Sequence, residues 1–341
     1  MYRVLDIQRV LEKVAPPQYQ ESYDNSGLLI GDADMKVKGV LISLDLTEAV
    51  LEEAIQKGCN MVVSHHPLIF KGLKSINSSH WIGRCVQKAV KNDIAVYAIH
   101  TNLDNVLTQG VNGKIADRIG LVNREVLLPK KGNLSFSVKA PALLKREVVE
   151  AVKSIHPQSL YVHEGFVNPM TDGKGDYFDC SGLVLPHTKK ELQRVLADFS
   201  VEPVFQLNEY LDSGLGAGLT GELELPVPER EFLDFLKKRL NTPLIRHTQL
   251  LGKSVSRVAV CGGAGSFLLN RARAAGADVF ITGDFKYHDF FEADNRILVA
   301  DVGHFESEQY TIELIFDILK DNFSTFALHC TKVNTNPINY Y

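Results

Sequence analysis

The sequence contains no apolar run long enough to cross a membrane. A membrane-spanning helix needs about 20 consecutive apolar residues, and no such stretch occurs anywhere in the 341 residues. The segment at 1–10, MYRVLDIQRV, carries charged side chains throughout and lacks the apolar centre of a signal peptide. We therefore expect a cytoplasmic protein that has no membrane partner.

Paired cysteines and an excess of positive charge are also missing. The five cysteines lie far apart and form no Cys-x-x-Cys pair, which favours buried free thiols over disulfides or a thiolate zinc site. Aspartate and glutamate outnumber lysine and arginine by 41 to 37, and the net charge is −4. This balance gives no overall attraction to nucleic acid. We expect no nucleic-acid partner unless a local basic patch supplies one.

Short apolar runs alternate with amphipathic stretches in two blocks of the chain. The apolar runs predict strands at 38–45, 60–64, 94–100, 255–260, 278–282 and 297–301. The amphipathic stretches predict helices at 47–57, 81–92, 266–275 and 306–321. Thr47 is suited to cap the first of these helices. The alternation indicates an α/β fold with mostly parallel sheets flanked by helices.

The middle of the chain follows a different order. It predicts strands at 136–141, 178–185 and 202–211, helices at 144–155 and 189–199, and a turn-rich loop at 168–175. This order suits a small α+β unit of the split βαβ type. We therefore expect an inserted domain at 127–212 within a discontinuous core made of 1–126 and 213–341.

Two adjacent histidines, His65 and His66, follow the strand predicted at 60–64. Successive side chains of a strand point to opposite faces, so two imidazoles in a row fit poorly inside a buried strand. A turn after Ser64 lets both rings face one space. The alternative is a polar loop that merely contains two histidines.

Similar side chains follow the other predicted strands. Ligands of open α/β sheets bind at the carboxyl ends of the strands. Besides the histidine pair, those ends carry Asp45, His100, Asp104, Asp284, His288, Asp301, His304 and Glu308. Each has an ordinary explanation alone, since Asp45 can cap a helix, His100 can bond a backbone carbonyl and Asp284 suits a turn. Together they predict a site along one edge of one sheet.

Five of these side chains form a candidate metal-ligand set, namely His65, His66, Asp104, His304 and Glu308. The last two are four residues apart and share one face of a helix. Five nitrogen and oxygen ligands are too many for one catalytic metal and too few to saturate two, so we predict two divalent ions per chain with water completing their coordination. The donor types suit zinc, iron or manganese. We expect Asp104 between the ions, and His100, Asp45 and Asp284 as a second tier around the ligands.

Four segments of the chain together resemble a known family. SHHPLIF at 64–70, HTNLDN at 100–105, GHFESE at 303–308 and YDNSGLLIG at 23–31 are similar to the NGG-interacting-factor-three-like family, whose members are often labelled GTP cyclohydrolase I type 2 homologues. The resemblance covers the whole predicted core. It implies that the five candidate ligands match the dinuclear metal ligands of the family one for one.

The resemblance also implies an assembly. The family is expected to form a ring-shaped homohexamer whose metal sites face an inner cavity. Some members carry an inserted domain resembling the signal-transduction and copper-tolerance trimer folds, and the insert of this chain is shorter and divergent.

A glycine-rich stretch, VAVCGGAGS at 258–266, lies between a predicted strand and a predicted helix. It matches neither the P-loop nor the full dinucleotide fingerprint. A tight structural turn is the favoured interpretation, and a phosphate cradle built from free backbone N–H groups is the alternative.

The leading functional hypothesis is a metal-dependent hydrolase of a small nucleotide-like or heterocyclic substrate, because two metal ions can activate water and polarise the bond that is attacked. The family label adds opening of the GTP ring as a candidate reaction. Two alternatives use the same ligands without catalysis: a metal-dependent regulator or adaptor, and metal storage or delivery.

Overall fold

The computed structural model describes residues 2–130, 134–155, 157, 159–166, 177–184, 188–207, 214–324 and 326–341. The chain divides into two compact units. Met1–Leu128 and Gly214–Tyr341 form the first, here called the core unit, and Pro129–Ser213 form the second, the inserted unit. The turn-rich loop predicted at 168–175 lies entirely outside the described residues. No helix in the described ranges has the length and apolar character needed to cross a membrane.

The first sheet of the core unit has five strands. Their spatial order is β1 (Gly27–Ile30), β4 (Ala95–Ala98), β3 (Met61–Ser64), β2 (Gly39–Ser43) and β15 (Ala327–Cys330). All neighbouring strands are parallel except β1, which is antiparallel to β4. β2, β3 and β4 are buried along their whole length, which explains why they read as continuous apolar runs in the sequence.

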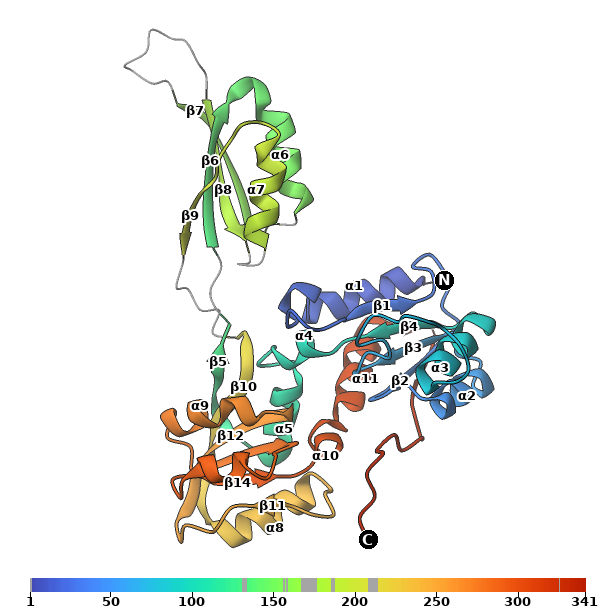
Figure 1. Ribbon diagram of the computed structural model, residues 1–341, viewed down its shortest axis with the longest axis vertical. Coiled ribbons are helices and arrows are strands. Elements are labelled where there is room, and N and C mark those ends of the chain that lie inside the picture. The colour runs from blue at the N-terminus through green and yellow to red at the C-terminus, as the bar shows by residue number, and fades with distance from the viewer. Residues whose placement is uncertain are drawn as a thin grey trace. The chain divides into compact units, whose positions relative to one another are not determined.

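Helices cover both faces of this sheet (Figure 1). They are α1 (Val4–Val14), α2 (Glu48–Gln56), α3 (Trp81–Lys91) and α11 (Thr311–Asn322). Leu41 and Val62 pack with apolar residues of α2 and α3, whereas Ile42 and Val63 pack with those of α1 and α11. The hydroxyl of Thr47 accepts a hydrogen bond from the amide of Val50 and caps α2, as the sequence predicted.

The second sheet has six strands. Their order is β11 (Arg246–His247), β14 (Leu298–Asp301), β13 (Val279–Gly283), β12 (Ser254–Ala264), β10 (Gly216–Pro228) and β5 (Val122–Pro129). β12, β13 and β14 are parallel, but β10 is antiparallel to β12 and β11 is antiparallel to β14. This sheet is therefore mixed, and the expectation of mostly parallel sheets holds only for the first one.

The described part of the core unit contains five further helices and several 3-10 turns. The helices are α4 (Thr101–Asp104), α5 (Val111–Ile119), α8 (Glu229–Arg239), α9 (Leu269–Ala274) and α10 (His304–Glu308). The 3-10 turns are η1 (Pro17–Tyr19), η4 (Ser266–Leu268) and η5 (Asp289–Ala293).

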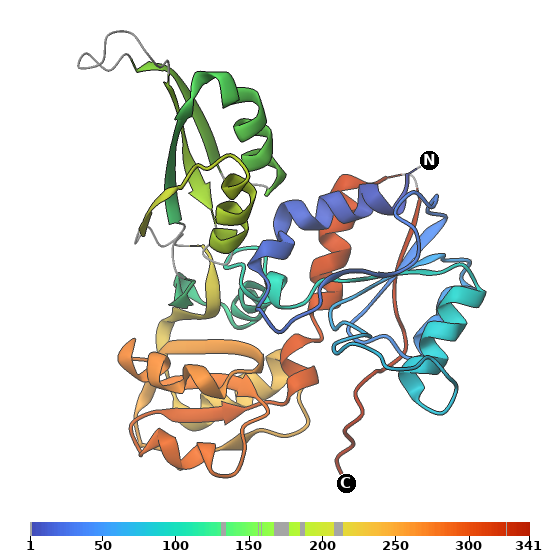
Figure 2. The ribbon, with the colours of Figure 1, turned by 45° about the horizontal axis from the view of Figure 1, so that its top comes forward.

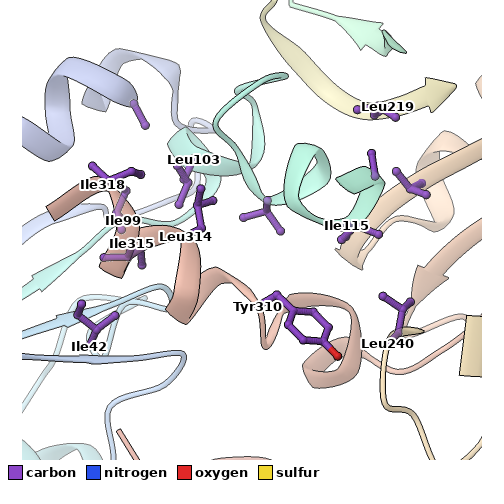
Figure 3. Close-up of a cluster of buried hydrophobic side chains, with 14 of the residues drawn as sticks. Ile42, Ile99, Leu103, Ile115, Leu219, Leu240, Tyr310, Leu314, Ile315 and Ile318 are labelled. Atoms are coloured by element: carbon purple, nitrogen blue, oxygen red, sulfur yellow. The ribbon is translucent and has the colours of Figure 1, made fainter. Parts of the chain in front are cut away.

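One continuous apolar cluster joins the two sheets. It includes Ile42 of the first sheet, Leu219 of the second, and Ile115 and Ile315 from the helices between them (Figure 3). Burial of apolar surface stabilises a fold by roughly 25 cal/mol per Å². Separating the sheets would expose the apolar surface of this cluster to water and would therefore be unfavourable. The two sheets consequently form one core.

The last predicted helix is two helices. The sequence predicted a single helix at 306–321, whereas α10 ends at Glu308 and α11 begins at Thr311. α10 packs on β12 and β13, and α11 packs on β2 and β15. The break thus carries the chain from the second sheet to the first. Neither Gly nor Pro marks it in the sequence, so periodicity alone could not reveal it.

The inserted unit has its own sheet and its own core. In chain order it contains β6 (Leu134–Pro141), η2 (Ala142–Leu144), α6 (Lys145–Ser154), β7 (Ser159–Phe166), β8 (Tyr177–Val184), α7 (Lys189–Ala197) and β9 (Val204–Leu207). The antiparallel sheet has the order β7, β8, β6, β9. Figure 2 shows both helices on one face of it. Buried apolar side chains of this unit form a separate cluster.

Candidate metal centre

Histidine and carboxylate side chains meet in the core unit where strands of both sheets end. His65 and His66 follow β3, and Asp104 is the last residue of α4, beyond β4. His304 and Glu308 begin and end α10, which follows β14. The expectation of a site along one edge of one sheet is therefore wrong. An alternation of strands and helices looks the same whether it builds one parallel sheet or two.

The ligand atoms of these five side chains form two groups that share Glu308. One group is His65, Asp104 and Glu308, the other is His66, His304 and Glu308, and the atoms within each group lie within 4.8 Å of one another. Glu308 Oε1 lies 3.9 Å from His65 Nε2, whereas Glu308 Oε2 lies 3.0 Å from Nε2 of both His66 and His304. Asp104 Oδ1 lies 3.5 Å from His65 Nε2. Glu308, in place of the predicted Asp104, is the carboxylate between the groups.

Each of the three histidines is held through Nδ1, so that Nε2 faces the cluster. The Nδ1 partners are the carbonyl oxygen of Ile99 for His65 at 2.8 Å, Asp45 Oδ1 for His66 at 2.7 Å and Asp284 Oδ2 for His304 at 2.8 Å. These oxygens only accept hydrogen bonds, so Nδ1 carries the proton and Nε2 of the neutral ring carries a lone pair. Metal-binding histidines typically have this arrangement. Asp45 and Asp284 accordingly lie directly behind two of the candidate ligands.

Some polar atoms of the cluster lack a hydrogen-bond partner, as expected of atoms that bind a cation. His65 Nε2 and Asp104 Oδ1 are buried without a hydrogen-bond partner in the described part of the chain, and each such atom costs about 1–3 kcal/mol. The Nε2 atoms of His66 and His304 face each other at 3.3 Å, which requires a proton or a cation between two lone pairs. Nitrogen and oxygen donors converging without sulfur suit a divalent transition metal.

The electrostatics of the cluster also favour positive charge. Burial lowers the pKa of His65 to about 4 and keeps its ring neutral. Burial opposes the charged form of His66 as well, but Asp45 and Glu308 raise its pKa to about 10. Glu308 and Asp284 likewise raise the pKa of His304 to about 11 against the effect of its burial. The carboxylates that hold protons on these two rings attract a metal cation for the same reason.

His100 lies beside the two groups and is supported by a residue that sequence reasoning missed. Its ligand atom is within 4.8 Å of those of His65 and His66, and its Nδ1 donates to Asp24 Oδ1 at 2.7 Å. Asp24 also accepts from the backbone and side chain of Thr101. Although burial acts in the opposite direction, these bonds hold the pKa of Asp24 below its usual range. Asp24 lies in the 23–31 motif, which was the available signal for it.

Two other residues from the strand ends lie outside the cluster. Asp301 accepts hydrogen bonds from the Arg246 side chain and from the amides of Phe285 and Gly303, which makes it part of the loop structure. His288 packs against the rings of Tyr287 and Phe291.

The glycine-rich end of β12 and the turn that follows it pack directly against Glu308. The amides of Gly262, Gly263 and Gly265 donate to the side chains of Asn112, Ser307 and Thr282. These N–H groups are therefore committed within the protein, which favours the structural turn over the phosphate cradle. Gly263 has φ +63°, and a Cβ atom there would lie 2.4 Å from Glu308 Oε1. Only glycine allows the carboxylate this approach.

The segment at 331–341 also reaches the cluster, which no local sequence pattern suggested. Thr335 Oγ1 donates to Asp45 Oδ2 at 2.7 Å, so that it is connected to His66 through Asp45. Asn336 Nδ2 donates to Glu306 Oε1 on α10 at 3.0 Å. This C-terminal segment thereby binds residues associated with both sheets.

A pocket of about 410 Å³ opens beside the histidines. Its lining residues are Leu44, Asp45, His66, Pro67, Phe70, His100, Asp284, His304, Phe305, Asn336, Pro337 and Ile338. The volume lies within the range of about 300–1,000 Å³ that is usual for small-molecule sites.

These features define a class of mixed α/β proteins in which a histidine and carboxylate cluster, able to hold metal ions, lies between two sheets. Residues 2–337 match the family model described as Duf34/NIF3 (NGG1p interacting factor 3), and the chain belongs to this family. A Staphylococcus epidermidis relative named "GTP cyclohydrolase 1 type 2 homolog" is 30% identical, with 99% of this chain and 100% of the relative covered. A Staphylococcus aureus relative of the same name shows the same identity and coverage.

A solved structure has the same fold. The crystal structure of a Bacillus cereus protein related to NIF3 is 28% identical to this chain, with a TM-score of 0.74. The match covers 100% of this chain and 99% of that protein.

Proposed function

We propose that the chain is a metal-dependent hydrolase with a dinuclear site that acts on a small nucleotide-like or heterocyclic substrate. The observation that carries this proposal is the pair of ligand groups that share the Glu308 carboxylate beside a pocket. Two divalent ions in such a site polarise the scissile bond and activate water near neutral pH.

In this proposal each ligand group holds one ion. His65 and Asp104 serve the first, His66 and His304 serve the second, and Glu308 serves both. Zinc, iron and manganese all suit these nitrogen and oxygen donors. Three of the five ligands are neutral imidazoles and two are carboxylates, so two divalent ions leave the loaded site with a net positive charge. That charge would favour binding of an electron-rich oxygen or nitrogen of the substrate.

The residues around the ligands have positioning roles. Asp45, Asp284 and the Ile99 carbonyl fix the orientation of the three imidazoles through Nδ1. Phe70 and Phe305 line the pocket and would exclude water from the bound substrate. The described residues offer no serine or cysteine nucleophile among those that line the pocket, which agrees with water as the attacking group.

The name shared by the staphylococcal relatives supplies one candidate reaction. Those proteins are called homologues of GTP cyclohydrolase 1 type 2, and hydrolytic opening of a purine ring is chemistry that a dinuclear site can support. We include GTP in the substrate panel for that reason.

A role as a metal-dependent regulator or adaptor is the second candidate. The inserted unit has a buried core of its own, so it can fold around its own side chains and offer a surface to a partner. Metal storage or delivery would use the same ligands. We further propose a cytoplasmic homohexamer, which native mass spectrometry of the purified protein would reveal as a six-chain species.

One experiment separates these functions. Protein loaded with zinc, iron or manganese is incubated with nucleotides, cyclic amides and phosphate esters, and product formation is followed by mass spectrometry. A hydrolase loses turnover with chelator and regains it with metal, and the His65→Ala variant has neither the first ion nor turnover. Protein that binds two ions but converts none of the panel would favour the adaptor or the storage role.

A further inference from the structure

The residues that line the pocket beside the candidate metal centre indicate which kind of ligand it binds. We propose that it binds an uncharged, flat heterocyclic ring, and that recognition of the ring, instead of a phosphate chain, determines specificity. This inference deepens the proposed function and rests on its site.

The shape and chemistry of the pocket walls support a flat ring. Half of the lining residues are apolar, among them Phe70 and Phe305. Phe70 is 40% exposed, although removing a phenyl ring from water is favourable. A bound ring that covers Phe70 would supply that burial. The pocket volume of about 410 Å³ accommodates a ring system of one or two fused rings.

Aromatic side chains form a series from the surface to the metal centre. The ring of Tyr23, which is 64% exposed, lies 6.3 Å from that of Phe70. The Phe70 ring in turn lies 6.1 Å from the His100 ring in an edge-to-face arrangement. Exposed aromatic faces next to a site are the surfaces on which heterocyclic bases stack. The series therefore offers a flat substrate a path that ends at the ligands.

The charges of the pocket disfavour a polyanion. No lysine or arginine is among the described residues that line it, whereas Asp45 and Asp284 are. Phosphate groups are usually held by arginine, lysine or free backbone amides, and the amides of the nearby glycine turn already donate to protein side chains. Once His66 and His304 hold metal, a phosphate chain would depend on the ions themselves, because the described lining offers it no lysine or arginine.

The C-terminal segment supplies a specific wall of the pocket. Asn336, Pro337 and Ile338 line it, and the segment is fixed by the hydrogen bonds from Thr335 to Asp45 and from Asn336 to Glu306. Asn336 contributes the one carboxamide among the described side chains of the lining. It can donate to and accept from the edge of a heterocycle, which a charged group cannot do equally well.

Calorimetric titration of the metal-loaded full chain tests the proposal. The probes are guanosine, adenosine and pterin as uncharged rings, GTP as a ring with a phosphate chain, and inorganic triphosphate as a chain without a ring. We expect at least one uncharged ring to bind at one site per chain, with an affinity within about 10-fold of that of GTP. Phe70→Ala should lower the affinities for the ring and for GTP by about the same factor, 10-fold or more. It should leave the affinity for inorganic triphosphate unchanged.

Phe291→Ala is the matched control, since Phe291 is also exposed, at 67%, but lines a different pocket. Metal content is measured for both variants, so that a lost ion is not mistaken for a lost ring contact. Failure of every uncharged ring to bind at about 1 mM would overturn the proposal. So would equal affinity of wild type and Phe70→Ala for the ring when both carry their metal. Ring binding without any turnover would instead contradict the hydrolase and leave the ring site standing.

Discussion

At the scale of the residue, Glu308 is the side chain that both groups of ligand atoms require. Its two oxygens face different histidines, and its neighbours Asp104 and His304 each belong to one group. The amide of Glu308→Gln keeps the size of the side chain but removes its charge. We expect this variant to lose affinity for both ions by more than about 100-fold, because losing a ligand costs more than losing a residue behind it.

Elemental analysis of the purified variant measures the bound metal. Asp104→Asn is the informative comparison, since it should affect only the ion held with His65. The exposed Glu313→Gln on α11 controls for loss of a carboxylate elsewhere on the chain. Two tightly bound ions in Glu308→Gln would show that this carboxylate is not a shared ligand.

Thr335 acts on the metal centre through Asp45. Its hydroxyl donates to the carboxylate that orients His66, and loss of such a supporting hydrogen bond typically weakens metal binding by about 10-fold. We expect Thr335→Val to lower the affinity for one of the two ions by that factor. Thr335→Ser should bind both ions as the wild type does. Competition with a chromophoric chelator measures both constants. Equal weakening in the serine variant would point to a packing role instead.

The cysteine thiols are protected from alkylation in the folded protein. Burial raises the pKa of Cys85 and of Cys180 to about 11, and it raises the pKa of Cys261 as well. A raised pKa means less thiolate at every pH below it, so at pH 8 only about one thiol in 1,000 is reactive at Cys85. We expect native iodoacetamide treatment at pH 8 to leave these three cysteines unmodified and the metal content unchanged.

Peptide mass spectrometry locates the adducts, and protein treated in urea provides the control in which all five cysteines react. Rapid native modification of Cys261 accompanied by metal loss would contradict this expectation.

At the scale of the element, the glycine-rich end of β12 controls the approach of Glu308. A Cβ atom at Gly263 would meet Glu308 Oε1, whereas at Gly276, which has a similar φ of +72°, it would meet nothing within 4 Å. Alanine at either position costs about 1–2 kcal/mol of backbone strain. We expect Gly263→Ala to lose metal and Gly276→Ala to keep it at similar thermal stability. Retention of both ions in Gly263→Ala would mean that Glu308 can move without harm.

The elements that the sequence predicted well are the ones buried on both faces. β2, β3 and β4 are short, continuous apolar runs, and such runs are typical of strands that are buried on both faces. β1 and β5 are only partly buried, so their patterns carry little signal and both were missed. The local order also predicted that histidines and carboxylates would gather. It could not predict that Glu308 would lie between them, since that depends on where α10 ends and on the contact with Gly263.

At the scale of the whole molecule, the inserted unit should be removable. It has its own apolar cluster, and the strands on either side of it, β5 and β10, are neighbours in the second sheet. Adjacent ends are typical of an inserted domain. We expect a chain in which a short glycine-rich linker replaces 129–213 to remain folded and to bind as much metal as the full chain.

Circular dichroism and elemental analysis check the two parts of this prediction. Native mass spectrometry of the same variant separates a role in folding from one in assembly. An insoluble or metal-free product would show that the inserted unit completes the core unit after all.

The long separation in sequence between the two ligand groups has a consequence for synthesis. His66 emerges from the ribosome early, but its partner Glu308 is made 242 residues later. The strand β15, which pairs with β2, is made later still. Domains assemble as units while the chain is being translated, and here the unit closes only after residue 330 has left the ribosome. The ligand set of the proposed dinuclear site is therefore incomplete while the chain is being translated. Loading of the proposed site would then be a step of maturation, and we expect fragments that end before β15 to bind no metal.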